Sequence, residues 1–290
     1  MNEVPRGPEG QETLPDTSKY QQILQRIEGV LAADSAEGDE QFVSERLAEL
    51  TSQSQAREIG MMTNKFHKGF IHPDSGVRRT YIVDPVHIDD EGLYRELLGT
   101  FRELKKTPGW ENRTLREIVP SAIQHTIGKY FGNAVADPDS EARNREFYLD
   151  KVSPEEGPRI SIKDFRGQRM AVCVEKAAAA QNLLNFVGIE SSLVMSSKCR
   201  IPEEGKEEGH AYNVFSTEKG NFIYDPANPR QQGDEEGRLV SIAPGMYRIT
   251  REELEGLHEG KSVTVEHKDT VLGSDGAVVK EDMHNRVYAG

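Results

Sequence analysis

The stretch from residue 167 to residue 188, G-Q-R-M-A-V-C-V-E-K-A-A-A-A-Q-N-L-L-N-F-V-G, constrains the fold more than any other part of the chain. From Val174 onward it is rich in strong helix formers and contains no proline, and Gly188 is typical of the residue that follows a helix end. Alanine and leucine side chains fall on one face of this helix, and the alanines are small enough to allow close packing against a sheet. We therefore predict a helix that begins near Cys173 and packs on a sheet.

The position of Cys173 at the start of this helix has a chemical consequence. The first turn of a helix offers unpaired backbone N–H groups and the positive end of the helix dipole, and both favour a thiolate over a thiol. One of those N–H groups can also stabilise the oxyanion that forms when a thiolate attacks an acyl carbon. By itself, a cysteine flanked by alanines is equally explained by packing, because buried cysteines are common. A nucleophilic role for Cys173 therefore depends on a partner base elsewhere in the chain.

Candidates for that base and for its orienting group lie in two later segments, G-H-A-Y around His210 and I-Y-D-P around Asp225. The chain between them reads as a β-hairpin with a turn of two or four residues centred on Glu218 and Lys219. In that register Tyr212 lies opposite Asp225, and His210 lies two residues from Tyr212 on the same face. This parity predicts a hydrogen bond between the imidazole and the carboxylate. A shift of one residue would instead place the two side chains on opposite faces.

The order of these motifs resembles the transglutaminase-like family of the papain-type cysteine hydrolase superfamily. The similar elements are C-V-E-K-A followed by L-L-N-F-V-G-I-E, then G-H-A-Y-N-V-F, then F-I-Y-D-P-A-N-P. The resemblance covers about residues 165–229, and it implies that Cys173 is the nucleophile, His210 the general acid and base, and Asp225 the group that orients His210. The fold implied is α+β, with an antiparallel sheet packed on the helix that carries the catalytic cysteine at its N-terminus and with additional helices before it.

The resemblance also suggests an oxyanion-hole residue. Papain-like relatives use a glutamine shortly before the cysteine for this purpose, so Gln168 is a candidate by analogy. A plain loop glutamine is an equally good interpretation, because the spacing is not diagnostic. Two departures from the family pattern bear on specificity. Tyr212 stands where many members carry Trp after His-Ala, and Asp225 is followed by P-A-N-P where P-T is usual. These departures keep the three proposed catalytic residues but give no guide to the substrate.

Other reactive side chains have weaker claims to a role. Cys199 falls in a polar segment predicted as a loop and is interpreted as an incidental thiol, whereas Glu175 and Lys176 are interpreted as helix-surface residues. Three histidines early in the chain match no recurrent spacing of metal ligands, so we expect neither a metal nor an organic cofactor. These histidines are His67, His72 and His87.

The remaining segments predict helices before the catalytic part and strands after it. Residues 1–60 are predicted to be a flexible tail followed by a helical extension that docks on the main body or contacts a partner. Two helices are predicted between residues 89 and 131, and a capping box, T-L-R-E, begins the second helix at Thr114. In this interpretation residues 61–270 form the catalytic domain, and residues 271–290 form a loosely held C-terminal tail.

Composition limits the classes of partner. The net charge of −13 and a pI near 5.2 argue against nucleic acid or an anionic membrane surface. The sequence has no apolar run long enough for a transmembrane helix, and its first residues lack the apolar core of a signal peptide. Its two cysteines do not make a disulfide framework. We therefore expect a cytoplasmic protein.

These patterns predict a thiol enzyme that acts on an amide or ester of a peptide, protein or small molecule through a covalent thioacyl intermediate. Water as the acceptor would make it a protease or amidase, and an amine would make it an acyltransferase. Hydrolysis is slightly favoured, since water needs no second binding site. The alternative is a non-catalytic module of the same fold that binds a peptide or protein in its cleft, although retention of all three reactive residues argues against it.

Overall fold

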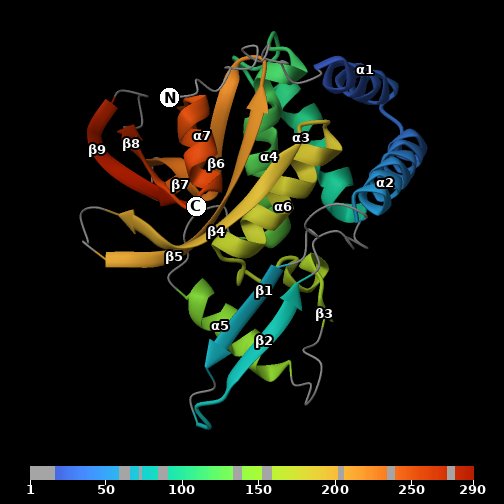
Figure 1. Cartoon of the computed structure of the whole chain (residues 1–290). Coiled ribbons are helices and arrows are strands. Elements are labelled where there is room, and N and C mark those ends of the chain that lie inside the picture. The colour runs from blue at the N-terminus through green and yellow to red at the C-terminus, as the bar shows by residue number, and fades with distance from the viewer. Residues whose placement is uncertain are drawn as a thin grey trace, which may run out of the picture.

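The computed structural model describes residues 17–58, 66–71, 74–83, 91–132, 139–151, 159–201, 206–233, 239–272 and 278–290 (Figure 1). Its α-helices are α1 (Thr17–Ala33), α2 (Ala36–Glu58), α3 (Glu91–Lys106), α4 (Leu115–Phe131), α5 (Ser140–Asp150), α6 (Cys173–Phe186) and α7 (Arg251–His258). Its strands are β1 (Phe66–Ile71), β2 (Arg78–Val83), β3 (Arg159–Ile160), β4 (Ser191–Ile201), β5 (Lys206–Thr217), β6 (Gly220–Gly233), β7 (Leu239–Ile249), β8 (Ser262–Leu272) and β9 (Val278–Ala289). Most of the helices precede the long strands, which makes the fold α+β.

A strongly curled antiparallel sheet forms one side of the main body. Its strand order is β7-β6-β5-β4-β9-β8, so the last strands of the chain insert beside β4. The curl brings β8 into contact with β6, and the sheet is nearly closed (Figure 1). Helix α6 packs on β4, β5 and β6. The predicted arrangement of an antiparallel sheet on the helix that begins at Cys173 is therefore confirmed.

Helix α6 is the centre of the larger hydrophobic core. Its four successive alanines, residues 177–180, are completely buried, because the sheet covers one side of the helix and α2, α3 and α4 cover others. Helix α4, which packs on α6 and also contacts β6 and β7, begins at the predicted capping box of Thr114 and Glu117 and ends at Gly132 in a left-handed conformation with φ of 73°. The small side chains of α6 let these layers approach closely.

The predicted helical extension docks on the main body. Tyr20, Ile23, Ile27 and Phe42 are buried in the same core as α6. The side chain of Arg46 in α2 is 1% exposed, and it donates hydrogen bonds to the carbonyl oxygens of Asn185 and Phe186 at the end of α6. A guanidinium at this place supplies additional donors to the last carbonyl groups of the helix and is attracted by the negative end of the helix dipole. Helix α2 therefore acts as a C-terminal cap for α6.

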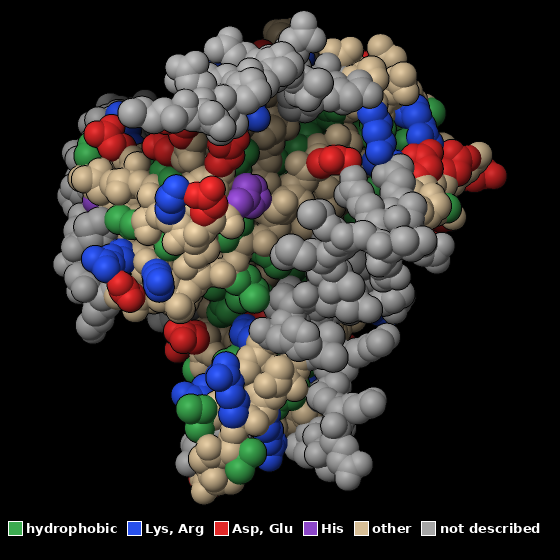
Figure 2. Space-filling view, viewed as in Figure 1, with side chains coloured by type: hydrophobic (Ala, Val, Ile, Leu, Met, Phe, Trp, Pro, Cys, Tyr) green, Lys and Arg blue, Asp and Glu red, His purple; other side chains and the backbone are tan. Residues whose placement is uncertain are grey.

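A smaller lobe projects below the main body in Figure 1 and contains β1, β2, β3 and α5. Strands β1 and β2 pair antiparallel, and β3 joins β2 in parallel. Aromatic rings pack its interior, with Tyr81, Tyr148 and Phe165 buried next to one another. Lys and Arg side chains gather on the surface of this lobe in Figure 2, although the chain as a whole is acidic.

Two expectations about the second half of the chain are wrong. Residues 278–289 do not form a loose tail, because β9 pairs along its length with β8 and meets β4 at Arg200 and Val287. Cys199 lies in strand β4 and not in a loop, and it is 4% exposed.

Further expectations concern the histidines and the membrane. His72, His87 and the side chain of His67 lie outside the described residues. In the part of the chain that the structure describes, no helix has the length and apolar character needed to cross a membrane.

Candidate active site

The N-terminus of α6 presents Cys173 as the first helical residue, as the sequence predicts. Val172, the residue before it, is extended, and the backbone N–H of Val172 donates to the carboxylate of Glu175 at 3.1 Å. Cys173 is partly exposed, whereas Glu175 is completely buried. The start of the helix is therefore held by a buried acid in its own first turn, and the thiol lies at the edge of the core.

The interpretation of Glu175 and Lys176 as surface residues is wrong, since both side chains are buried. The Glu175 carboxylate accepts hydrogen bonds from Lys68 in β1 at 2.9 Å, from Asn144 at 3.1 Å and from Tyr148 at 2.8 Å. A buried carboxylate is tolerated when a cation and several donors satisfy it. This cluster fastens the first turn of α6 to β1 and α5, and it thereby fixes the direction in which Cys173 points.

The β5–β6 hairpin has the register predicted from the sequence. Asn213 pairs with Tyr224 and Thr217 pairs with Gly220, so the turn contains two residues, Glu218 and Lys219. The imidazole Nε2 of His210 lies 2.7 Å from Oδ2 of Asp225, which is the predicted hydrogen bond between diagonal neighbours on one face. The His210–Asp225 pair is almost sealed from solvent, with the two side chains 8% and 0% exposed.

The carboxylate of Asp225 is saturated with donors. Its Oδ1 accepts from the backbone N–H groups of Ala227 and Asn228 at 3.1 and 3.2 Å. Its Oδ2 accepts from His210, from the Asn228 amide at 2.9 Å and from the Tyr288 hydroxyl at 2.7 Å. Burial alone would raise the pKa of Asp225, but the charge of His210 and the hydrogen bonds from His210, Asn228 and Tyr288 hold it well below its usual range. Asp225 is therefore an anion at any pH near neutrality.

His210 connects the carboxylate to the thiol. Burial would lower the pKa of His210, but the charge and hydrogen bond of Asp225, together with a hydrogen bond and charge interaction with Cys173, raise it well above its usual value. Because Nε2 is engaged by Asp225, the imidazole has its other nitrogen left for the thiol. The predicted pair of His210 and Asp225 is therefore present, and Cys173 is among the groups that raise the pKa of His210.

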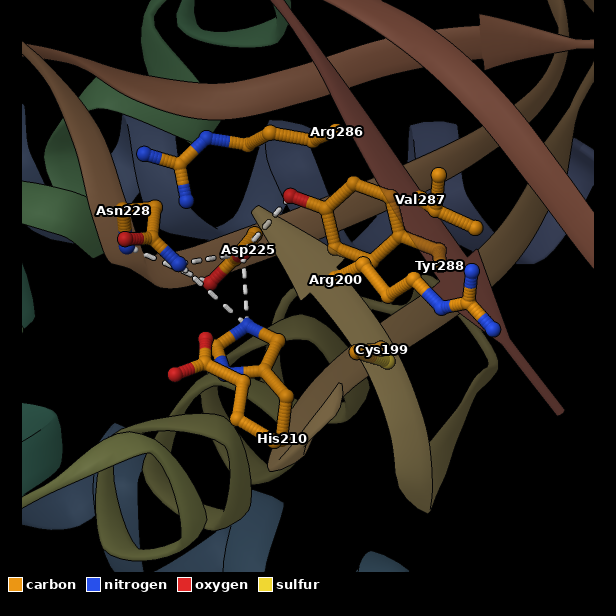
Figure 3. A pocket seen from close by; sticks show the side chains of 9 residues that line it. Cys199, Arg200, His210, Asp225, Asn228, Arg286, Val287 and Tyr288 are labelled. Carbon is orange, nitrogen blue, oxygen red and sulfur yellow. Dashed lines mark hydrogen bonds and ion pairs between the residues drawn. The ribbon is translucent and has the colours of Figure 1, made fainter. Parts of the chain in front are cut away.

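A small cavity lies on another side of the His210–Asp225 pair (Figure 3). Side chains from β4, β5, β6 and β9 line it, and Cys173 is not among them. In Figure 3 the guanidinium group of Arg286 extends toward Asn228, and the ring of Tyr288 lies above Cys199 with its hydroxyl directed at Asp225. The His210–Asp225 pair thus has side chains of the C-terminal strand β9, among them Tyr288, on the side of this cavity, and Cys173 lies outside it.

Gln168 remains a prediction. It is exposed in the loop before α6, where its backbone N–H donates to the carbonyl of Phe165 at 3.1 Å. Within the described residues its side chain has no hydrogen bond with His210 or Asp225. A different glutamine, Gln124 of α4, is buried and donates to the carbonyl of Pro226 at 3.2 Å, so it braces the segment next to Asp225.

Several residues of the site escaped the sequence analysis. Asn228 belongs to the motif P-A-N-P and lies three residues after Asp225, a spacing typical of a side chain that folds back on an aspartate in a turn. No comparable local signal marks Tyr288, because its partner is 63 residues away in the sequence. Gln124 lies in a helix whose other residues suggested only packing.

Neither the comparison with protein-family models nor the comparison with curated proteins finds a match for this sequence. An activity is therefore inferred from the residues and from their geometry.

Proposed function

We propose that this chain is a cysteine enzyme of the transglutaminase-like kind that takes an acyl group from an amide or ester onto Cys173. The supporting observation is the position of His210, which hydrogen-bonds Asp225 at 2.7 Å and interacts with Cys173 at the N-terminus of α6. Such a chain of nucleophile, base and orienter is the arrangement that activates a thiol for acyl transfer. The transglutaminase-like fold is part of the proposal, with α3 and α4 as its N-terminal helical part.

The proposed reaction proceeds in two balanced halves. In the first, the Cys173 thiol gives its proton to His210, and the thiolate attacks the acyl carbon to form a C–S bond. Backbone N–H groups at the start of α6 stabilise the oxyanion of the tetrahedral intermediate. The intermediate collapses when His210 returns the proton to the leaving amine or alcohol, which breaks the C–N or C–O bond and leaves a thioacyl enzyme.

The second half reverses the proton transfers with a new acceptor. His210 takes a proton from the acceptor, which attacks the thioester carbon, and the C–S bond breaks to return the thiol. Water as the acceptor gives hydrolysis, and an amine gives acyl transfer. Hydrolysis is our preferred outcome, because water needs no binding site of its own. The acceptor supplies the electron pair of the new bond and the proton that His210 passes to the departing sulfur of Cys173, so the chemistry requires no metal or organic cofactor.

The proposal is tested by comparing the alkylation rates of the two cysteines. Iodoacetamide at pH 6 should modify Cys173 at least tenfold faster than Cys199, because Cys173 is partly exposed at a helix start, whereas Cys199 is buried and burial raises the pKa of its thiol. His210→Ala should reduce this advantage, and Ser216→Ala, a change on the same strand at its far end, is the matched control. A Cys173 that reacts no faster than Cys199, or that ignores the loss of His210, would contradict the activated thiol.

A second experiment separates an enzyme from a binding module. A cell extract is passed over the wild-type protein, and Cys173→Ala serves as the control. A mass increase on the peptide that contains Cys173, absent after treatment with hydroxylamine, would identify a thioacyl intermediate and its acyl group. An activated Cys173 that never acquires an acyl group from amide or ester donors, while the protein retains a peptide noncovalently, would favour the binding module.

A further inference from the structure

The C-terminal strand β9 carries a residue whose side chain contacts the proposed catalytic groups. Tyr288 of β9 is 2% exposed, and its hydroxyl donates to Oδ2 of Asp225 at 2.7 Å. This is the same oxygen that accepts from Nε2 of His210 at 2.7 Å. Together with the Asn228 amide at 2.9 Å, three donors therefore share one carboxylate oxygen, and only His210 belongs to the proposed proton-transfer chain.

The ring of Tyr288 is fixed from several sides. Its centroid lies 6.1 Å from that of His210, 4.9 Å from that of Tyr212 and 5.7 Å from that of Tyr247. The neighbouring residue Ala289 is held as well, because its carbonyl accepts from the Tyr212 hydroxyl at 2.9 Å and its N–H donates to the sulfur of Cys199 at 3.4 Å. Because the neighbouring rings hold the ring of Tyr288 and the contacts of Ala289 hold the backbone beside it, the Tyr288 hydroxyl is directed at Asp225.

From this geometry we propose that Tyr288 is a positioning residue of the active site, which holds the Asp225 carboxylate and limits how strongly it binds the His210 proton. The inference rests on the proposed function. A carboxylate that already accepts a strong hydrogen bond is a weaker acceptor for a second donor at the same oxygen. Tyr288 therefore keeps the imidazolium proton transferable to a leaving group, while it prevents Asp225 from rotating away.

Other groups around the pair also act on its protonation, and the test must hold them constant. They are Cys173 from α6, Cys199 and Arg200 from β4, Glu208 and Tyr212 from β5, Tyr224 and Asn228 from β6, Tyr247 from β7, and Arg286 from β9. Asn228 shares Oδ2 with Tyr288 but lies in the same loop as Asp225. Tyr288 differs from all of them because it joins a separate strand to Asp225 by one hydroxyl.

Tyr288→Phe removes that hydroxyl and keeps the ring. In a histidine-detected NMR titration, with the His210 signal assigned from His210→Gln, the imidazolium of the variant should lose its proton at higher pH than in the wild type. The alkylation rate of Cys173 at pH 6 should rise by about 2- to 10-fold, the factor that corresponds to one hydrogen bond, because a more basic His210 holds the thiol proton more firmly and so favours the thiolate. Tyr247→Phe is the matched control, because the Tyr247 hydroxyl bonds His267 and not Asp225.

A titration of His210 that stays in place, or that moves to lower pH, would overturn the inference, since a merely packing role of Tyr288 leaves it unchanged. If Tyr288→Phe does not fold, 3-fluorotyrosine at position 288 provides the opposite test. Its more acidic hydroxyl is a stronger donor, so His210 should then lose its proton at lower pH than in the wild type. The titration does not depend on the thiol, and an unreactive Cys173 would therefore contradict the proposed function without deciding the role of Tyr288.

Discussion

The two cysteines of this chain lie on different sides of one histidine–aspartate pair, and their surroundings give them opposite chemistry. Cys173 is partly exposed at a helix N-terminus and interacts with His210. Cys199 is buried in β4, where its sulfur both donates to and accepts from the backbone of Ala289. Burial raises the pKa of the Cys199 thiol, although its hydrogen bond with Ala289 opposes the shift. Of the two thiols, only Cys173 combines a helix start with an open approach, which is why we propose it, and not Cys199, as the nucleophile.

The largest expected effect follows from neutralising the orienting acid. Asp225→Asn keeps the shape of the side chain, but its amide N–H₂ cannot accept the imidazole proton, so His210 is left in the wrong tautomer for a base. We expect acylation of Cys173 to fall by about 10²- to 10⁴-fold, while the slow alkylation of Cys199 is unchanged. Rates of both reactions, followed by mass spectrometry of the two cysteine peptides, check this. Faster alkylation of Cys199 would point to unfolding, because unfolding exposes that buried thiol.

A second change tests the cluster that directs Cys173. Glu175→Gln removes the charge that Lys68 faces at 2.9 Å, with the two side chains 0% and 13% exposed. Because it leaves a mostly buried cation unpaired, we expect the free energy of unfolding to fall by about 3 to 5 kcal/mol. Chemical denaturation measures the loss. The double variant that also carries Lys68→Met should recover most of it, and no recovery would show that the cost has another source.

A smaller effect is expected in the pH dependence of stability. The pKa of Asp225 is lowered on folding, so its contribution is present above the ordinary value of 3.8 and is lost as the pH falls through the lower folded value. The pKa of His210 is raised, so its contribution is complete below 6.5 and is lost as the pH rises through the raised value. The free energy of unfolding of the wild type, minus that of His210→Gln, should therefore be largest between pH 3.8 and 6.5. A difference that grows at higher pH would contradict the raised value.

The smallest effect is expected at the second thiol. Cys199→Ala deletes a buried sulfur and its two contacts with Ala289, which should cost about 1 to 2 kcal/mol of unfolding free energy. Its effect on Cys173 alkylation at pH 6 should be within twofold. Thermal unfolding and the alkylation rate measure the two quantities side by side. A large fall in the Cys173 rate would show that the two sides of the pair are coupled, and the comparison between them would then fail.

The parts of the site that the sequence predicts are those encoded locally. A two-residue turn fixes the register of β5 and β6, so His210 and Asp225 could be placed on one face from parity alone. The start of α6 at Cys173 follows from helix propensity and from the change in composition before it. The capping box at Thr114 likewise needs only four consecutive residues.

The parts that could not be predicted depend on distant neighbours. Glu175 resembles a surface residue until β1 and α5 supply Lys68 and Tyr148 around it. Cys199 stands among charged residues in the sequence, and nothing local indicates that β9 pairs beside β4 there or that Cys199 packs in a core with Tyr288 and Ala289. The run of four alanines does indicate that α6 is buried on every side, because a helix with one exposed face would carry polar residues within such a run.

The sequence separations within the site also set an order for its assembly. His210 and Asp225 are 15 residues apart and are joined by a tight turn, whereas Tyr288 is 63 residues from Asp225. Closing the longer loop costs more chain entropy, and non-local strand pairing is slow compared with a hairpin that forms in about microseconds. During refolding we expect the hairpin to form before β9 joins β4 and β8, and stopped-flow alkylation should detect full reactivity of Cys173 only after that last step. Reactivity before β9 pairs would contradict this order. The proposed nucleophile thus reaches its final surroundings only after a strand that is far from it in the sequence has joined the sheet.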